Sequence, residues 1–202
     1  KGNDTYVRII DYKTGSKKFS KDDAQYGINL QMLLYLYSII FSESKRYGKN
    51  VKPAGVLYLI VKRPAGKANL GDDIGKTLEK TEENSFCTNG IVLDNPEIIY
   101  AMEKEQSGKY IPVKQNAGGT YSKNSSIISS DEMMKLLNDA ADASAKLMSE
   151  LKGGHIEINP YKCDKINSCA YCDLNDFCRL EKKNEKTRYN LESLLSDTEE
   201  EK

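Results

Sequence analysis

The sequence predicts an α/β fold in which a mixed central sheet is flanked by helices. Two runs, at residues 6–13 and 55–62, are rich in the Val, Ile, Leu and Tyr side chains that pack well in strands. Apolar residues recur at helical spacing over residues 22–44 and again over residues 129–151. The chain has 202 residues, 39% hydrophobic and 30% charged, which is an ordinary composition for a chain that buries a core.

The first strand is expected at residues 6–13, and the next segment, 22–44, predicts one helix packed against it. The apolar side chains of that helix repeat every three to four positions. They are Ile28, Leu30, Met32, Leu33, Leu36, Ile39 and Ile40. Residues 55–62 predict a central strand, because this run is apolar without polar alternation.

The middle of the chain carries weaker signals. Residues 64–84 are rich in Gly, Lys, Asp and Glu with little periodicity, which predicts a mobile excursion. Asn95-Pro96 predicts the start of a helix over residues 97–105, because proline suits the first helical turn. Residues 109–129 predict a loop with short strands.

The last long helix begins at a recognisable signal. Ser129 and Glu132 have the three-residue offset of a capping box, and the helix is expected to run through Leu151 and stop at Gly153-Gly154. Its apolar stripe predicts core packing. The stripe consists of Met133, Leu136, Leu137, Ala140, Ala143, Leu147 and Leu151. Residues 181–202 are highly charged and predict a flexible tail.

Asp11 and Lys13 are the first candidate site residues. They lie two residues apart near the end of the first predicted strand, so their side chains share one face. A carboxylate there can hold Mg²⁺, while a lysine can position or deprotonate a water and stabilise charge on a phosphorane. This division of labour suits hydrolysis of nucleic-acid phosphodiesters. An acid and a lysine also alternate on many solvated strand faces, so the pair alone leaves both interpretations open.

Gln31 and Tyr35 lie one turn apart on the predicted helix. The Gln31 amide can hydrogen-bond a phosphate or a base, and Tyr35 can present a hydroxyl to the same cleft. The alternative for Tyr35 is a core aromatic residue whose hydroxyl reaches water.

Cys169, Cys172 and Cys178 form the second chemical cluster, with Cys163 six residues before the first of them. In an intracellular protein, cysteines this close bind zinc or an iron–sulfur cluster more often than they form disulfides. The spacing Cys-x2-Cys-x5-Cys lacks the second Cys-x-x-Cys of a zinc ribbon, so iron–sulfur and zinc both stay open. We interpret Cys163 as a bystander in a loop.

These motifs resemble a known family: the C-terminal nuclease domain of the B subunit of bacterial ATP-dependent helicase–nucleases, the AddB/RexB type, within the PD-(D/E)XK superfamily. The resemblance takes in four ordered stretches, at residues 7–37, 90–97 and 154–161 and at the cysteine cluster that ends with Arg179. Four ordered matches are far more specific than one short motif.

The resemblance implies roles for the candidate residues. Asp11 would be a metal-binding carboxylate, Lys13 the catalytic lysine, and Gln31 and Tyr35 the pair of a helical Gln-x-x-x-Tyr motif. The implied cofactors are Mg²⁺ or Mn²⁺ and a structural four-iron four-sulfur cluster. The last three ligands of that cluster would be Cys169, Cys172 and Cys178, and its first ligand lies upstream of the nuclease motifs in the family.

The expected organisation is a nuclease domain over residues 1–180, incomplete at its N-terminus, with the iron–sulfur loop at 160–179 and the tail at 181–202. Residues 1–4 predict the turn before the first strand. In the family a preceding strand supplies another metal-binding aspartate. We therefore expect this chain by itself to lack a complete metal site and to be inactive alone.

The implied function is DNA end resection in double-strand-break repair by homologous recombination, with single-stranded DNA as the main substrate and the helicase–nuclease A subunit as partner. No apolar run has membrane-spanning length and the charged start is not a secretory signal, which indicates a cytoplasmic protein. The alternative is a non-catalytic DNA-binding or assembly module with a degenerate nuclease fold. A CRISPR-type or viral exonuclease is less favoured, because of the matches at residues 90–97 and 154–161.

The charge balance constrains how such a protein meets DNA. The 30 basic and 30 acidic residues cancel, so attraction to DNA has to come from local clusters. The candidates are Lys17, Lys18, Lys21, Lys45, Arg46, Lys49, Lys52, Lys62 and Arg63. Each of them alone is equally explained as a solvated surface side chain.

Overall fold

The computed structural model describes residues 2–15, 19–42, 44–48, 50–61, 73–77, 81, 86–156, 158, 160–163, 166–178 and 188–189. The chain divides into two compact units, Lys1–Ala145 and Lys146–Lys202. Among the described residues, each unit contains one sheet. Most of the predicted excursion at 64–84 and nearly all of the predicted tail at 181–202 lie outside the described residues.

The first unit is built on a four-stranded mixed sheet in the order β1-β2-β3-β4. The strands are β1 (Asp4–Lys13), β2 (Asn50–Ile60), β3 (Asn89–Leu93) and β4 (Ile127–Ile128). β1 and β2 are parallel, β2 and β3 antiparallel, and β3 and β4 parallel. The mixed α/β architecture predicted from the sequence is therefore confirmed, and residues 55–60 of the predicted central strand belong to the interior strand β2, while Lys62 lies outside the described residues.

Two local features let the central strands pack closely. The register between β1 and β2 shifts at Val7/Arg8, where Val7 pairs with Pro53 and Arg8 with Gly55. An irregularity of this kind accommodates a proline, which cannot donate a hydrogen bond inside a regular ladder. At Gly90 in β3, a Cβ atom would collide with the main-chain oxygen of Val56 in β2. Only glycine allows the two strands this approach.

The segment predicted as one helix over 22–44 is broken in three, and this part of the prediction is wrong. It forms α1 (Asp22–Gln25), α2 (Gln31–Phe41) and α3 (Ser44–Tyr47). Gly27 has a φ of +76° and Asn29 a φ of +57°, values that end a right-handed helix and that Gly and Asn tolerate best. Asn29 Nδ2 donates to Asp23 Oδ2 at 2.6 Å and fixes the turn.

The helices α5 (Pro96–Met102) and α6 (Ser130–Lys152) begin where the sequence indicates. In α5, the side chain of Asn95 accepts hydrogen bonds from the main-chain N–H groups of Glu97 and Ile98. In α6, the N–H of Glu132 donates to Ser129 Oγ and the N–H of Ser129 donates to Glu132 Oε2. The predicted capping box is thereby confirmed.

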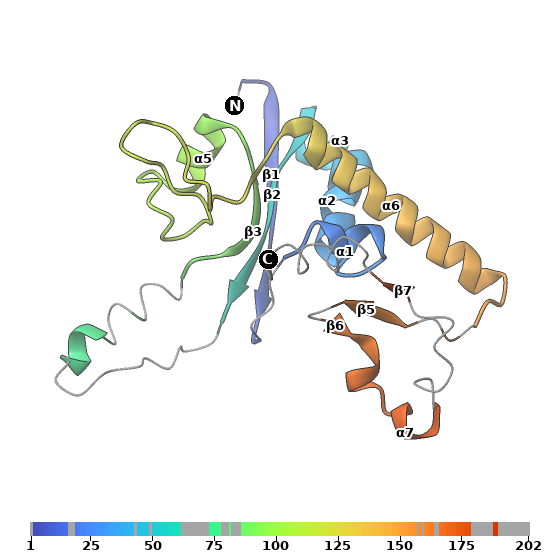
Figure 1. Cartoon of the computed structure of the whole chain (residues 1–202). Coiled ribbons are helices and arrows are strands. Elements are labelled where there is room, and N and C mark those ends of the chain that lie inside the picture. The colour runs from blue at the N-terminus through green and yellow to red at the C-terminus, as the bar shows by residue number, and fades with distance from the viewer. Residues whose placement is uncertain are drawn as a thin grey trace, which may run out of the picture. The chain divides into compact units, whose positions relative to one another are not determined.

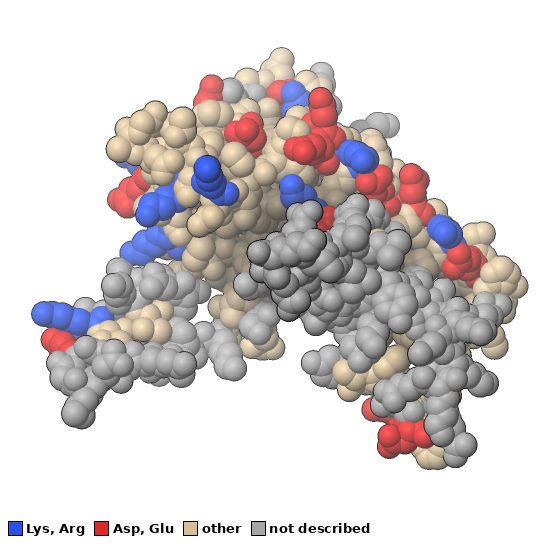
Figure 2. All heavy atoms as spheres, viewed as in Figure 1, with Lys and Arg blue, Asp and Glu red and all other residues tan. Residues whose placement is uncertain are grey.

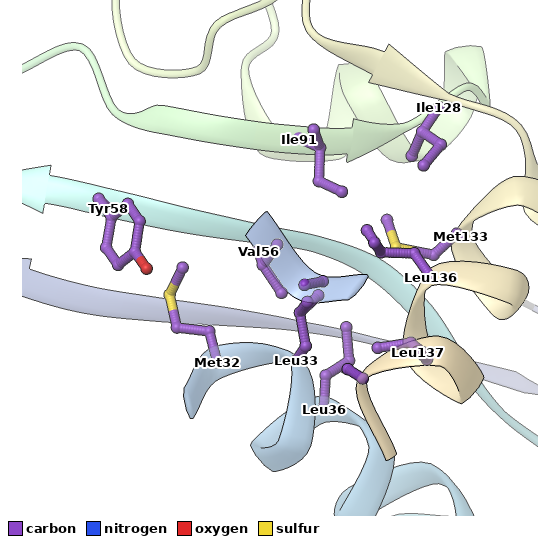
Figure 3. Close-up of a cluster of buried hydrophobic side chains, with 12 residues drawn as sticks. Met32, Leu33, Leu36, Val56, Tyr58, Ile91, Ile128, Met133, Leu136 and Leu137 are labelled. Carbon is purple, nitrogen blue, oxygen red and sulfur yellow. The ribbon is translucent and has the colours of Figure 1, made fainter. Parts of the chain in front are cut away.

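The helices cover the two faces of the sheet (Figure 1), with α2 and α6 on one face and α5 on the other. The first core lies between the sheet, α2 and α6 (Figure 3), and it includes Met32, Leu33, Leu36, Val56, Tyr58, Ile91, Ile128, Met133, Leu136 and Leu137. The second core lies on the other face and consists of Leu57, Val92, Ile99, Ile111 and Val113. The apolar stripe of α6 is buried only up to Ala140, whereas Leu147 and Leu151 are exposed.

The second unit contains a small sheet in the order β6-β5-β7. Its strands are β5 (Tyr161–Cys163), β6 (Ile166–Asn167) and β7 (Arg188–Tyr189). The 3-10 helix η1 (Ser168–Tyr171) and the short helix α7 (Asn175–Cys178) follow β6. Tyr161 is almost fully buried at the start of β5.

Candidate active site

Asp11 and Lys13 lie at the end of β1 on the sheet face that α2 covers. Val7 and Ile9, which precede them at the same alternation, pack into the core beneath α2. Lys13 Nζ lies 2.5 Å from Asp11 Oδ2, with side chains that are 26% and 28% exposed. The two-residue spacing therefore brings the Asp11 carboxylate and the Lys13 ammonium together, as expected, at a partly buried position.

The Asp11 carboxylate has one oxygen that is shielded from water. This oxygen, Oδ2, is buried, and the ammonium of Lys13 lies 2.5 Å from it and supplies the opposite charge. Carboxylate oxygens are also the hard donors that Mg²⁺ and Mn²⁺ prefer. The chemistry of Asp11 therefore fits one ligand of such a cation.

Lys13 is held in its charged form. Its interaction with Asp11 raises the pKa of the ammonium against the opposing effect of burial, and Tyr58 and Tyr35 act in the same direction as Asp11. Lys13 Nζ also lies 5.4 Å from the centre of the Tyr58 ring, a distance that allows a cation–π interaction. This lysine is therefore arranged to present positive charge rather than to take up a proton.

Tyr58 is a site residue that the sequence analysis missed. It lies on β2 as the register partner of Asp11 and is only 2% exposed. Burial raises the pKa of its hydroxyl, Lys13 lowers it, and Asp11 and Asp23 raise it. Its position in an apolar strand suggested a core residue, and the pairing of β1 with β2 places its ring beside Lys13.

Gln31 and Tyr35 form the predicted pair on the exposed side of α2. Gln31 Nε2 donates to Tyr35 Oη at 3.1 Å. Gln31 is the first residue of α2, directly after the turn held by Asp23 and Asn29. Tyr35 is 54% exposed, so it is not the core aromatic of the alternative interpretation. Since Tyr35 contributes to the electrostatic environment of Lys13, the exposed side of α2 borders the Asp11–Lys13 pair.

The cysteine cluster lies in the second unit. Cys169 is in η1 and Cys178 ends α7, and the N–H of Cys172 donates to the Cys169 carbonyl at 3.2 Å. Among the residues that the structure describes, no three His, Cys, Asp or Glu side chains are grouped to hold a metal ion. The three cysteines thus lie in one short segment, but in this structure their side chains do not converge on a common point as metal ligands would. Cys163 ends β5, and its side chain lies outside the described set.

The basic residues proposed for DNA contact are described only in part. Lys52 Nζ lies 2.6 Å from Asp4 Oδ2, and Arg46 lies beside the Tyr47 ring. Lys21 is exposed. The other candidates either lie outside the described residues or have side chains that do, and they are Lys17, Lys18, Lys45, Lys49, Lys62 and Arg63.

None of the helices in the described part of the chain has the length and apolar character that a membrane span requires.

Comparison with known proteins gives the same family as the motifs. The chain is 33% identical to the B subunit of the ATP-dependent helicase/deoxyribonuclease of Thermoanaerobacter sp. (strain X514). The alignment of 191 residues covers 94% of this chain and 16% of the relative. Proteins of the same name from Clostridium botulinum (strain Loch Maree / Type A3) and Caldanaerobacter subterraneus subsp. tengcongensis are 34% and 36% identical, over 93% and 90% of this chain and 16% of each relative. The chain thus spans 16% of the length of these relatives. The model of the PD-(D/E)XK nuclease superfamily matches residues 1–179, and the chain belongs to this superfamily.

Proposed function

We propose that the chain is a metal-dependent DNA nuclease domain whose reactive centre is the Asp11–Lys13 pair. The observation that carries the proposal is the partly buried carboxylate at the end of β1, with one shielded oxygen and a charged lysine 2.5 Å away. A divalent cation bound there would polarise the scissile phosphate and activate a water. Membership of the PD-(D/E)XK superfamily supports this chemistry.

Each residue of the site then has a defined task. Asp11 supplies one oxygen ligand for the cation. Lys13, whose pKa is raised by Asp11, places a positive charge where negative charge develops on the phosphate. Gln31 and Tyr35, hydrogen-bonded to each other on the exposed side of α2, offer an amide and a hydroxyl to the strand that is being cut.

The wider role is part of the same proposal. The relatives carry the name of the B subunit of an ATP-dependent helicase/deoxyribonuclease, which supports DNA as substrate and a further subunit as partner. Within this proposal the DNA is single-stranded, the partner is the helicase–nuclease A subunit, and the biological task is DNA end resection in the cytoplasm. We place the nuclease domain at residues 1–180. A further aspartate from a preceding strand and a four-iron four-sulfur cluster on Cys169, Cys172 and Cys178 complete the proposed site and its structural support.

The experiment is cleavage of 5′-labelled single-stranded DNA with Mg²⁺ or Mn²⁺, by this chain alone and within the full-length protein with its partner. Lys13→Gln should lower the cleavage rate about 10²- to 10³-fold, the range found when one charge-stabilising group is removed. Lys135→Gln is the control, because Lys135 is an exposed lysine of α6 that is not among the candidates for DNA contact. Cleavage by Lys13→Gln at the rate of the control would remove the lysine from the mechanism.

The cofactors need their own tests. Anaerobically purified protein should contain iron and sulfide, both absent from Cys172→Ser, and zinc without iron would replace the proposed cluster by a zinc site. Asp11→Asn should weaken the response to Mg²⁺ and Mn²⁺. No cleavage in any form, with partner and ATP present, would favour the second candidate, a DNA-binding or assembly module. The observation that favours it is that, among the described residues, no three His, Cys, Asp or Glu side chains are grouped to hold a metal ion.

A further inference from the structure

The sheet face opposite the Asp11–Lys13 pair is only partly covered. The second core joins β2 and β3 to α5 and to the segment 103–126 that follows α5, and it includes Leu57, Ile99 and Ile111. The side chains of β1 that point to this face are Arg8, Ile10 and Tyr12, which alternate with Ile9 and Asp11. All three are exposed, and Tyr12 is 69% exposed. An aromatic ring therefore faces solvent directly behind the site.

A second exposed ring, that of Tyr110, is fixed at the same end of the sheet. The Tyr110 carbonyl accepts hydrogen bonds from Thr88 N at 2.9 Å and Thr88 Oγ1 at 2.7 Å, while its N–H donates to Glu103 Oε2 at 3.3 Å. The main chain is thus held on both sides, and the ring is left 50% exposed.

The strand register gives the separation between the two tyrosines. Tyr12 pairs with Leu59, the residue after Tyr58, and Tyr58 pairs with Asn89, which directly follows Thr88. The main chain of Tyr110 is hydrogen-bonded to Thr88, so it lies about three strand spacings, roughly 14 Å, from that of Tyr12. A single strand of a few nucleotides spans this distance easily.

The segment that carries Tyr110 has a positive formal charge. Residues 106–130 contain Lys109, Lys114 and Lys123 and no Asp or Glu, although the charges of the whole chain cancel. Lys109 Nζ lies 5.8 Å from the centre of the Tyr110 ring. Figure 2 shows several Lys and Arg side chains, with some Asp and Glu, on the lobe formed by α5 and the segment after it. Lysines beside an exposed ring are complementary to the charge of a polyanion.

We propose that Tyr12, on the sheet face behind the reactive pair, and Tyr110, at the same end of the sheet with Lys109 beside its ring, form a contact surface for single-stranded nucleic acid. Exposed rings that stack on bases and cations that follow the backbone are the two elements of strand binding without sequence preference. The surface would hold the strand near the site while a phosphodiester is cut on the other face. This inference rests on the proposed nuclease function and adds a binding site to it.

The test is equilibrium binding of a fluorescein-labelled oligothymidylate to the full 202-residue chain in EDTA, where no metal-dependent cleavage occurs. Tyr12→Ala and Tyr110→Ala should each weaken binding by about tenfold, the double variant by about a hundredfold, and the corresponding Phe variants little, because the ring does the stacking. Lys109→Gln should reduce the slope of log K against log salt by about 0.7, because it removes one cation that pairs with a phosphate.

Tyr47→Ala is the matched control, because Tyr47 is 43% exposed and has a cation, Arg46, at 5.8 Å from its ring, on α3. It should bind as the unchanged chain does. If the folded double variant also binds like the unchanged chain, the proposal is overturned, and a protein partner for the exposed edge becomes the better explanation. Cleavage is measured separately with Mg²⁺ in the full-length protein with its partner, so binding without cleavage there would count against the nuclease assignment and not against this surface.

Discussion

Glu103 is the buried carboxylate on which the segment 103–126 depends, and its replacement by glutamine is a strict test of the fold. The side chain is 5% exposed. One oxygen accepts from Ser107 Oγ at 2.8 Å and Lys109 N at 3.0 Å, and the other accepts from Tyr110 N at 3.3 Å and Ile111 N at 3.1 Å. All four partners are donors. The site is therefore built for a carboxylate and for no other group of that size.

The magnitude follows from this count. Glutamine keeps one acceptor oxygen but places an NH₂ group, which is itself a donor, against the other two donors. Two hydrogen bonds to a charged group are therefore lost, and each contributes about 1.5–3 kcal/mol to the free energy of unfolding. The amide is easier to bury than the carboxylate, which offsets part of this cost. We expect Glu103→Gln to lower the free energy of unfolding by about 3 kcal/mol, or the melting temperature by about 6–12 °C in a domain of this size.

The pH dependence gives a second signature. Burial alone would raise the pKa of Glu103, but hydrogen bonds from Ser107, Ile111, Lys109 and Tyr110 outweigh it and hold the pKa below its ordinary value of 4.5. A lowered folded pKa means stabilisation that is full above the unfolded pKa and is lost as the pH falls through the folded pKa. The difference in free energy of unfolding between the unchanged chain and Glu103→Gln should thus have its full value at pH 7 and become smaller below about pH 4.5.

The assay is urea and thermal denaturation followed by circular dichroism, with Glu105→Gln as control. Glu105 is an exposed glutamate two residues away, and its replacement should leave the melting temperature unchanged. A shift in melting temperature for Glu103→Gln no larger than that of the control, or a difference as large at pH 3 as at pH 7, would refute the reasoning. The first result would mean that the four donors find other partners, and the second that the carboxylate is not the charged acceptor.

Three further changes test other parts of the structure. Leu36→Ala removes a side chain with no exposed surface from the core under α2, and it should lower the free energy of unfolding by about 2–5 kcal/mol in urea titrations, against little change for the exposed Leu151→Ala. Asn95→Ala removes the acceptor that caps α5 and should cost about 1 kcal/mol by the same measurement, while Asn95→Asp keeps the cap. Tyr58→Leu removes the ring beside Lys13 and should shift the alkaline limb of the cleavage pH profile to lower pH, because the ring no longer stabilises the charged form of Lys13; Tyr58→Phe should leave the limb in place.

The parts of the fold that the sequence predicts well are those specified by neighbours along the chain. The Ser129–Glu132 capping box and the Asn95 cap are local patterns, and both are present. Asp11 and Lys13 share a face because strand alternation requires it, and Gln31 and Tyr35 meet because one helical turn separates them.

The features that the sequence does not predict depend on contacts between residues that hydrophobic periodicity does not report. Apolar spacing continues through residues 22–44, so a single helix is the natural prediction, yet Gly27 and Asn29 adopt positive φ and the Asp23–Asn29 hydrogen bond holds the turn. Tyr58 meets Lys13 only because β1 and β2 pair in one register, with Asp11 opposite Tyr58. A shift of one residue would turn the Tyr58 ring to the other face of the sheet.

The two faces of this sheet are held in different ways, and this makes their roles separable by mutation. On the α2 face, Asp11, Lys13, Gln31 and Tyr35 stand on β1 and α2, whose core is buried and apolar. On the other face, the main chain at Lys109 and Tyr110 is bound directly by one carboxylate, Glu103. Loss of that carboxylate should therefore weaken the binding of single-stranded DNA through Tyr110 while the geometry of the Asp11–Lys13 pair persists.

At temperatures below its melting temperature, Glu103→Gln should raise the KM for single-stranded DNA more than it lowers kcat, whereas Lys13→Gln should lower kcat more than it raises KM. Equal effects of the two variants on kcat would mean that the two faces do not act independently.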